Sequence, residues 1–366
     1  MPQEVKIAKL GVNDDLKASR VAIDQVGHYL VTATKNEGGN LQVTSWFLDP
    51  NGTPRPYDRA VGGGVGIVDI RHVGNGVFAT SVENAVGNLE IITWSLSPLG
   101  KITRHEEIVF GKVSAIATDA FEYHNKLVVA VVDSAGKVRI KLLDIDKETH
   151  ALEQLDNEIG NDSSLVDIET AGTRLINLYS RDADGNFKVS SFLHGHEDVR
   201  PSRGEPYGSG NLGAIKVAKR GGRRRSNKGS RVALIDGHGG LRVTSLGFGR
   251  SRTERGAIEI TRHDSTKAPV GKAISIASND RDFGFWTAVQ GADQKLRVDF
   301  WGYGDPLVHH PEGAPVNHGS HTDSQAINDV VCASPYYGNH LVTAATTDGG
   351  GLVVAAWRAD GVQQAD

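Results

Sequence analysis

The stretch KLVVAVVDSAGKVRIKLL, residues 126–143, contains the pattern that decides the fold. Two runs of β-forming residues flank a short turn that carries Gly136, and the second run ends on the large apolar residue Leu143. Such runs are typical of β-strands, and a glycine between them predicts a tight hairpin because glycine tolerates positive φ. The stretch therefore predicts a pair of antiparallel strands.

The same hairpin recurs along the whole chain. Its last residue recurs at intervals of 48, 49, 49, 54, 55 and 56 positions. A repeat of this length made only of β-strands is typical of one four-stranded propeller blade. Because these residues hold the same position in each repeat, we expect them to form the core between blades. They are Trp46, Trp94, Leu143, Phe192, Leu246, Trp301 and Trp357.

Over its whole length the sequence resembles the seven-bladed β-propeller superfamily, in fold and not in any specific function. The resemblance implies a single all-β domain over residues 1–366, built of four-stranded antiparallel blades. Only nine residues follow Trp357, too few for the outer strand of the last blade, whereas residues 5–10 alternate apolar and polar residues. We therefore expect residues 5–10 to supply that strand and close the ring, which removes an exposed sheet edge.

The amino-acid composition limits which partners and which cellular location are expected. The formal net charge of −4 gives no general attraction for nucleic acid or acidic membranes, and no apolar stretch is long enough to predict a membrane span. Cys332 is the only cysteine, so no internal disulfide forms, and its apolar strand predicts burial. We expect a monomer. We expect it to be cytoplasmic, because residues 1–10 lack the apolar core of a signal peptide, or to be secreted if a leader has been removed.

The innermost strands of a propeller line its axial channel, so residues at matching positions form tiers around it. One tier carries three carboxylates, which suit a hard cation such as Ca²⁺ or Mg²⁺, zinc being less favoured, or acid–base catalysis. The neighbouring tier contains Asp24, Arg71 and Glu169. The first tier consists of Ala22, Asp69, Ala115, Asp167, Lys216, Ser275 and Asp329.

A purely structural role for these charges is the alternative. Lys216 lies one blade from Asp167, and Arg71 lies one blade from Asp24, so each can form an ion pair between neighbouring blades. The functional interpretation assigns catalytic or metal-binding roles to Asp69, Asp167 and Asp329. It makes Lys216 their electrostatic partner and leaves space for a ligand beside Ser275 and Arg71.

Two further segments carry candidate binding residues. The link at residues 302–326 is rich in histidine, which predicts the lining of a ligand entrance, a metal site or a solvated loop. An insertion at residues 219–231 and the turn at 247–256 are strongly basic, which predicts either an anionic partner or a flexible loop. The histidines are His309, His310, His318 and His321, and the anion-binding candidates are Arg223, Arg224, Arg225, Arg250 and Arg252.

These observations favour a protein that binds a small molecule at the channel mouth. No P-loop, G-x-S-x-G, H-E-x-x-H or dinucleotide motif occurs in the sequence, so an enzyme of this kind would be a hydrolase or lyase without a redox or nucleotide cofactor. The alternative is a non-enzymatic propeller that acts as a protein scaffold or binds a carbohydrate or polyanion.

Overall fold

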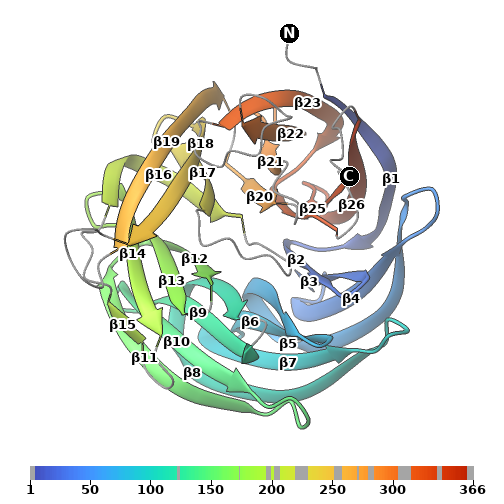
Figure 1. The fold of residues 1–366 in the computed structure, drawn as a ribbon. Helices are drawn as coiled ribbons and strands as arrows, with labels where there is room; N and C mark the ends of the chain where they lie inside the picture. The colour runs from blue at the N-terminus through green and yellow to red at the C-terminus, as the bar shows by residue number, and fades with distance from the viewer. Residues whose placement is uncertain are drawn as a thin grey trace.

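The computed structural model describes residues 5–121, 124–172, 174–194, 199–201, 207–218, 230–250, 258–269, 272–278, 284–303, 315–335 and 340–360. In these ranges there is no α-helix, and every strand pair is antiparallel. The predicted all-β class with antiparallel sheets is therefore confirmed. Figure 1 shows the strands arranged around a central axis.

The strands hydrogen-bond in four sheets. The largest contains β2 (Arg20–Val26), β3 (Tyr29–Lys35), β4 (Asn40–Leu48), β5 (Pro54–Gly74), β6 (Val77–Asn84), β7 (Asn88–Leu96), β8 (Ile102–Phe121), β9 (Lys126–Asp133), β10 (Lys137–Ile145) and β11 (Leu152–Asp162). The second contains β12 (Leu165–Ala171), β13 (Leu175–Arg181), β14 (Asn186–His194), β15 (Val199–Pro201), β16 (Tyr207–Val217), β17 (Ser230–Asp236), β18 (Gly240–Arg250) and β19 (Ile258–Pro269). The third contains β20 (Ile274–Ser278), β21 (Phe285–Gln290), β22 (Lys295–Tyr303) and β23 (Pro315–Ala326), and the fourth contains β24 (Asp329–Ala333), β25 (His340–Thr346), β26 (Gly351–Asp360) and β1 (Lys6–Lys17).

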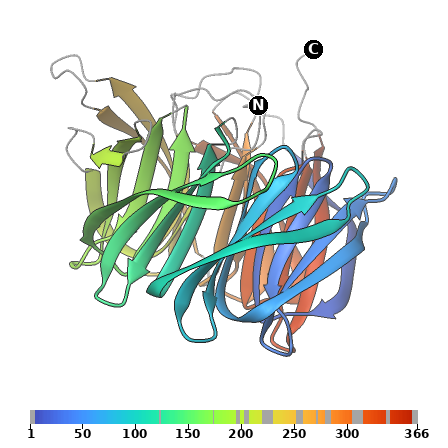
Figure 2. The ribbon, with the colours of Figure 1, turned by 90° about the horizontal axis from the view of Figure 1, so that it is seen from below.

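The tight hairpins have one recurrent turn. In the β9–β10 turn, Asp133 Oδ1 accepts hydrogen bonds from the backbone N–H groups of Ala135 and Lys137 at 2.9 and 3.0 Å. Gly136 adopts a φ of 77°, which is why glycine is favoured there. Figure 2 shows such hairpins side by side, with the strands running between two faces of the molecule. The equivalent positive φ occurs at Gly39, Gly87, Gly185, Gly239, Gln294 and Gly350.

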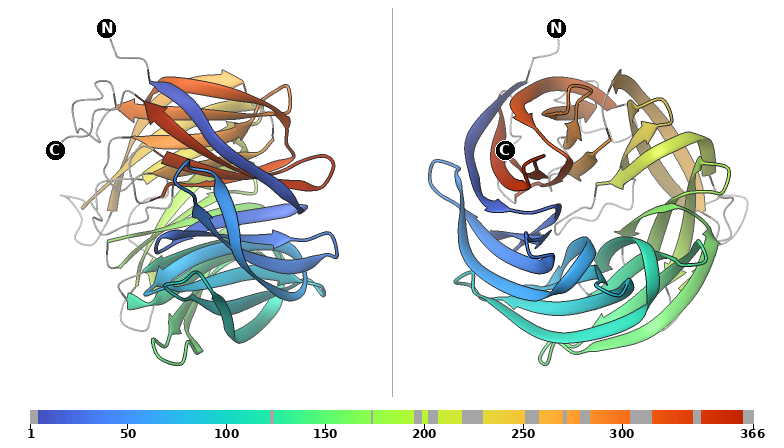
Figure 3. Two further views of the ribbon diagram at one scale, coloured as in Figure 1. Left: turned by 90° about the vertical axis from the view of Figure 1, so that its right-hand side faces the viewer. Right: turned by 180° about the vertical axis from the view of Figure 1, so that it is seen from behind.

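The N-terminal strand pairs with the last strand of the chain. β1 is antiparallel to β26, with Lys9 opposite Trp357. Both views in Figure 3 show β1, in dark blue, beside the red C-terminal strands. The predicted pairing of the N-terminal segment with the strand that holds Trp357 is confirmed, although β1 runs on to Lys17 because it follows β26 back to Gly351.

Seven strands, which we call the inner strands, contact one another in chain order. β2 contacts β5, and the contacts continue through β8, β12, β16, β20 and β24; β24 in turn contacts β2. β5 and β8 are long because each pairs with one strand along its first half and with the next strand along its second half. The inner strands therefore surround the central axis.

The large apolar residues at the hairpin ends are buried. Trp46, Trp94, Trp301 and Trp357 are at most 1% exposed, and the expected core role of these residues is confirmed. Cys332 is also buried, as expected, and burial raises the pKa of its thiol to about 12.

Candidate functional site on the axis

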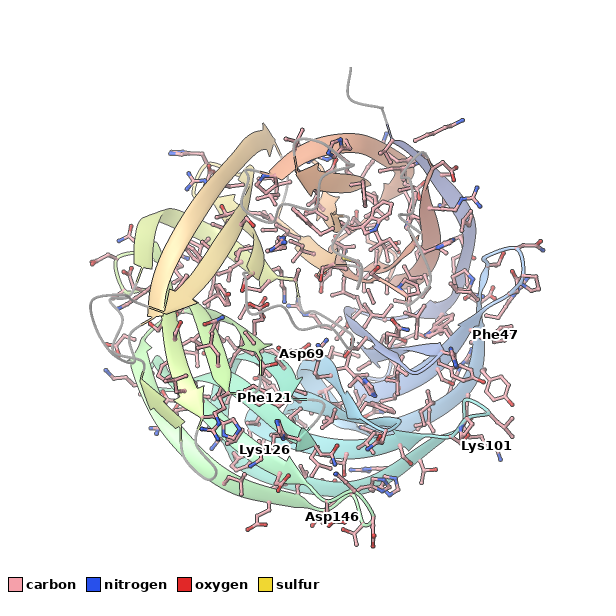
Figure 4. All side chains as sticks on the ribbon, viewed as in Figure 1. Phe47, Asp69, Lys101, Phe121, Lys126 and Asp146 are labelled. Atoms are coloured by element: carbon pink, nitrogen blue, oxygen red, sulfur yellow. The ribbon has the colours of Figure 1, made fainter. Side chains whose placement is uncertain are left out.

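A cavity of about 100 Å³ lies among the inner strands. The structure brings together five of the predicted site residues in its lining, namely Asp69, Arg71, Asp167, Lys216 and Ser275. Asp69 lies toward the middle of the molecule (Figure 4). Since a water needs about 10–15 Å³ of such space, the cavity suits a ligand of roughly ten non-hydrogen atoms or fewer.

Asp69 and Asp167 each link two inner strands. Asp69 Oδ1 accepts the N–H of Ile70 at 2.9 Å, and its Oδ2 accepts the N–H of Thr118, on the next inner strand, at 2.7 Å. Asp167, which is 1% exposed, accepts the N–H groups of Ile168 and Val217 in the same way, at 2.9 and 2.7 Å. Hydrogen bonds to a charged acceptor contribute about 1.5–3 kcal/mol each. Both carboxylates therefore have a structural function as links between neighbouring inner strands.

The same link recurs around the axis. Ser275 Oγ accepts the N–H of Cys332 at 3.0 Å, and Asp24 Oδ2 accepts the N–H of His72 at 2.7 Å. Asp119 Oδ2 accepts the N–H of Thr170 at 2.6 Å. The donor of each link lies on the inner strand that follows the acceptor's strand around the axis. The oxygens of these side chains thus accept hydrogen bonds from backbone N–H groups that find no acceptor in the pairing of strands.

Arg71 carries a buried network of ion pairs. Its Nη1 lies 3.3 Å from Asp24 Oδ1, which confirms the predicted ion pair between neighbouring inner strands. Its Nε lies 2.7 Å from Asp119 Oδ1, a second partner that the sequence did not reveal. Arg71 is 4% exposed, so its charge is balanced inside the protein by two carboxylates.

Lys216 and Asp329 form the more accessible part of the predicted set. Lys216 is exposed, and its positive charge acts on Asp329. Burial raises the pKa of the Asp329 carboxyl, and the charges of Lys216 and Arg20 partly offset that rise. Arg20 Nη1 lies 4.0 Å from Asp329 Oδ2. The electrostatic partner that the structure supports for Lys216 is therefore Asp329.

His72 is a cavity residue that the sequence did not single out. It follows Arg71 in β5, and its backbone N–H is held by Asp24. Its Nε2 atom is buried and has no hydrogen-bond partner among the described residues. Burial lowers the pKa of His72. The negative charge of Asp24 opposes that shift, and the positive charge of Arg71 adds to it. No motif marks this position, because His72 lies one residue past Arg71 and so falls outside both tiers of residues expected to face the channel.

Glu169 was expected to face the channel, and the structure corrects this expectation. Glu169 Oε2 accepts a hydrogen bond from the Tyr179 hydroxyl at 3.0 Å and another from the Ser230 hydroxyl. All three residues are buried. Burial, together with the negative charge of Glu169, raises the pKa of Tyr179 well above its usual value. Glu169 is therefore part of a buried polar cluster formed by β12, β13 and β17.

The predicted position of two histidines at the channel mouth is wrong. His318 and His321 lie on β23, the outer strand of its sheet, where Val298 is opposite His321. The chain forms this strand because the free edge of β22 requires a hydrogen-bonding partner. The His321 ring lies 5.3 Å from the Trp357 ring, and burial lowers the pKa of His318. His309 and His310 lie outside the described residues.

Most of the predicted anion-binding residues are also outside the described residues. These are Arg223, Arg224, Arg225 and Arg252, while the backbone of Arg250 pairs with Ile258. Arg231, which the sequence placed in the basic insertion, belongs to β17 and is 4% exposed. It is therefore a buried strand residue instead of part of a solvated loop.

Neither a metal-binding cluster nor a membrane-spanning helix occurs within the described ranges. No group of three or more His, Cys, Asp or Glu side chains there is placed to hold a metal ion, so Asp69, Asp167 and Asp329 do not converge into such a site. In that part of the chain, too, no helix is long and apolar enough to cross a membrane. No protein-family model matches the sequence, and no curated protein matches it.

Proposed function

We propose that this protein is a seven-bladed β-propeller that binds a small polar molecule in the cavity on its axis. The propeller is supported by the closed order of contacts among the seven inner strands and by the pairing of β1 with β26. It is also supported by the hairpin turn that recurs with positive φ at the same place in each repeat. In this arrangement each blade packs only against its neighbours.

The observation that carries the binding proposal is the polar lining of the axial cavity. His72 contributes a buried Nε2 with no hydrogen-bond partner among the described residues, and Lys216 contributes an exposed ammonium group. A buried polar atom without a partner is costly, so a ligand or water that completes its bonding is favoured. Together, the His72 ring nitrogen and the Lys216 ammonium group suit a ligand with hydroxyl or carbonyl groups.

Binding is favoured over catalysis by the engagement of the carboxylates. Each oxygen of Asp69 and Asp167 already accepts a backbone hydrogen bond, which leaves fewer lone pairs for a substrate proton or a metal. Asp329 is not among the described residues that line the cavity, but burial raises the pKa of its carboxyl group, which suits proton transfer. A hydrolase or lyase of this fold would depend on Asp329 and Lys216.

The test is a thermal-shift screen of the purified protein against Ca²⁺, Mg²⁺, Zn²⁺, monosaccharides, sugar lactones and small dicarboxylates. We expect a monosaccharide, lactone or dicarboxylate to raise the melting temperature. The variants Lys216→Met and His72→Gln should lose this shift, and Lys112→Met, an exposed lysine of β8 away from the cavity, should keep it.

The proposal fails if no compound stabilises the wild type, or if both cavity variants respond as the wild type does. Turnover of a stabilising lactone would be measured in the same samples. If Asp329→Asn abolished turnover and left the thermal shift intact, the site would be catalytic.

A further inference from the structure

A second and larger cavity lies away from the axis. Its volume is about 740 Å³, and it shares only Gln25 with the described lining of the axial cavity. Its walls come mainly from the β2–β3, β4–β5 and β7–β8 turns, with further residues from the middle of β1, the segment just after β24, the start of β25 and the end of β26. Because the strands are antiparallel, these turns lie on the face opposite the β3–β4 hairpin turn. Phe47, one of its residues, lies toward the edge of the molecule in Figure 4.

Three aromatic rings line this cavity at steep angles to one another. The Tyr29 and Tyr57 rings are 6.2 Å apart and tilted by 53°, and the Phe47 and Tyr57 rings are 6.5 Å apart and tilted by 78°. Phe47 is 38% exposed and Tyr57 is 53% exposed, in contrast to the buried tryptophans. Large aromatic side chains that stay exposed around a cavity are typical of binding sites.

The backbone holds two of these rings in place. Gly100 has a φ of 80°, and a Cβ atom added there would lie 2.6 Å from Tyr29 and 3.0 Å from Tyr57. The Tyr29 hydroxyl also donates a hydrogen bond to the Pro98 carbonyl at 3.4 Å. The rings therefore rest on the β7–β8 turn, which lowers the entropy lost when a ligand binds.

The charged groups around this cavity are paired within the protein. Asp49 Oδ1 accepts the N–H groups of Asn51 and Thr53, and its Oδ2 pairs with Arg55 at 3.3 Å. Arg358 pairs with Asp360 at 2.7 Å. These pairs leave the neutral polar side chains of Gln25 and Asn51 beside the aromatic rings. Such a lining favours a ligand without net charge.

We propose that this cavity binds a neutral oligosaccharide of two or three sugar units. Sugar rings present an apolar C–H face that packs on an aromatic ring and hydroxyl groups that bond to amide side chains. The volume falls within the 300–1,000 Å³ or so that is usual for sites of this size. The aromatic rings are inclined to one another at 53° and 78°. This arrangement suits the successive non-planar rings of an oligosaccharide better than it suits a flat aromatic ligand, because a flat ligand stacks best between parallel surfaces.

The test uses the full chain with maltotriose, cellotriose and tri-N-acetylchitotriose in isothermal titration calorimetry, alongside an uncharged proline-rich peptide. At least one trisaccharide should bind with a Kd below about 1 mM. Tyr57→Ala and Phe47→Ala should each weaken that binding about tenfold or more. Leu99→Ala removes an exposed apolar side chain next to the same turn, outside the cavity lining, and should leave binding unchanged.

Three outcomes would overturn the proposal: no binding of any trisaccharide, unchanged binding by both aromatic variants, or binding of the peptide alone. Circular dichroism and the melting temperature of each variant separate lost binding from lost folding. Lys216→Met and His72→Gln should keep trisaccharide binding, since they line the other cavity, so this site and the axial site are tested independently.

Discussion

The indole N–H of Trp357 donates a hydrogen bond to the hydroxyl of Thr343 at 2.9 Å, across the pair formed by β26 and β25. The same bond, with the same separation of 14 residues and the same length, joins Trp46 to Thr32, Trp94 to Thr80 and Trp301 to Thr287. Where the hairpin ends instead on Leu143, Phe192 or Leu246, the residue 14 positions earlier is Val129, Leu178 or Val232. At these four hairpin ends tryptophan and threonine thus occur together, and the threonine hydroxyl is the acceptor of the buried indole N–H.

Replacing Thr343 with valine should destabilise the protein by about 1–3 kcal/mol, because the Trp357 N–H would remain buried without an acceptor. Urea unfolding monitored by tryptophan fluorescence measures this change. In the background of Trp357→Phe, which has no N–H, the same substitution should cost much less. Equal costs in the two backgrounds would show that the hydrogen bond contributes nothing.

Replacing Gln294 with glycine should stabilise the protein by up to about 1 kcal/mol, because the relieved steric cost exceeds the extra backbone entropy that glycine loses. Gln294 has a φ of 65° in the β21–β22 turn, where the other hairpins of this type have glycine. A side chain in this conformation carries a steric cost that glycine avoids. Gly136→Gln, at the matching position of the β9–β10 turn, is the reciprocal control and should lower the melting temperature. A stabilising Gly136→Gln would contradict the account.

Stability should fall as the pH drops below about 6.5, and His72 should contribute to the fall. The unfolded imidazole titrates near 6.5, and burial lowers the folded pKa of His72. Between these two pKa values the unfolded chain binds more protons than the folded protein, so acid favours unfolding. Melting temperatures measured from about pH 7.5 to about pH 5 should fall less steeply for His72→Gln.

His238→Gln, at an exposed position in the β17–β18 turn, is the control for this pH series and should follow the wild type. If the slopes of the wild type and His72→Gln coincide, the acid sensitivity comes from other groups. His105 and His318, whose pKa values burial also lowers, would then be replaced in turn.

Deleting residues 1–10 should lower the melting temperature by more than about 5 °C. The deletion removes the pairs of Lys6 to Lys9 with β26, the backbone bond from Val5 N–H to the His318 carbonyl, and the ion pair between Lys9 and Asp323. It also exposes part of the edge of β26, so aggregation should increase. Differential scanning calorimetry and light scattering measure both effects; an unchanged melting temperature would mean that β1 adds no stability.

The alternation of apolar and polar residues, the turn glycines and the spacing of the hairpin ends were sufficient to determine the strand class, the hairpins and the burial of Trp46, Trp94, Trp301 and Trp357. The strand count, which leaves the last hairpin without an outer strand after Trp357, identified the N-terminal segment as the partner of that hairpin. These features follow from the sequence alone because strand periodicity and turn conformation depend on residues close together in the chain.

The tertiary structure alone decided which distant groups meet. Asp69 and Thr118 are 49 residues apart, and their hydrogen bond depends on how two inner strands are placed side by side. For the same reason the sequence could not assign Asp119 to Arg71, place His318 on an outer strand, or bring Tyr29 and Tyr57 together over Gly100. A periodic pattern defines which side of a strand a residue occupies, whereas side-chain donors and acceptors on distant strands meet only through the way those strands pack together.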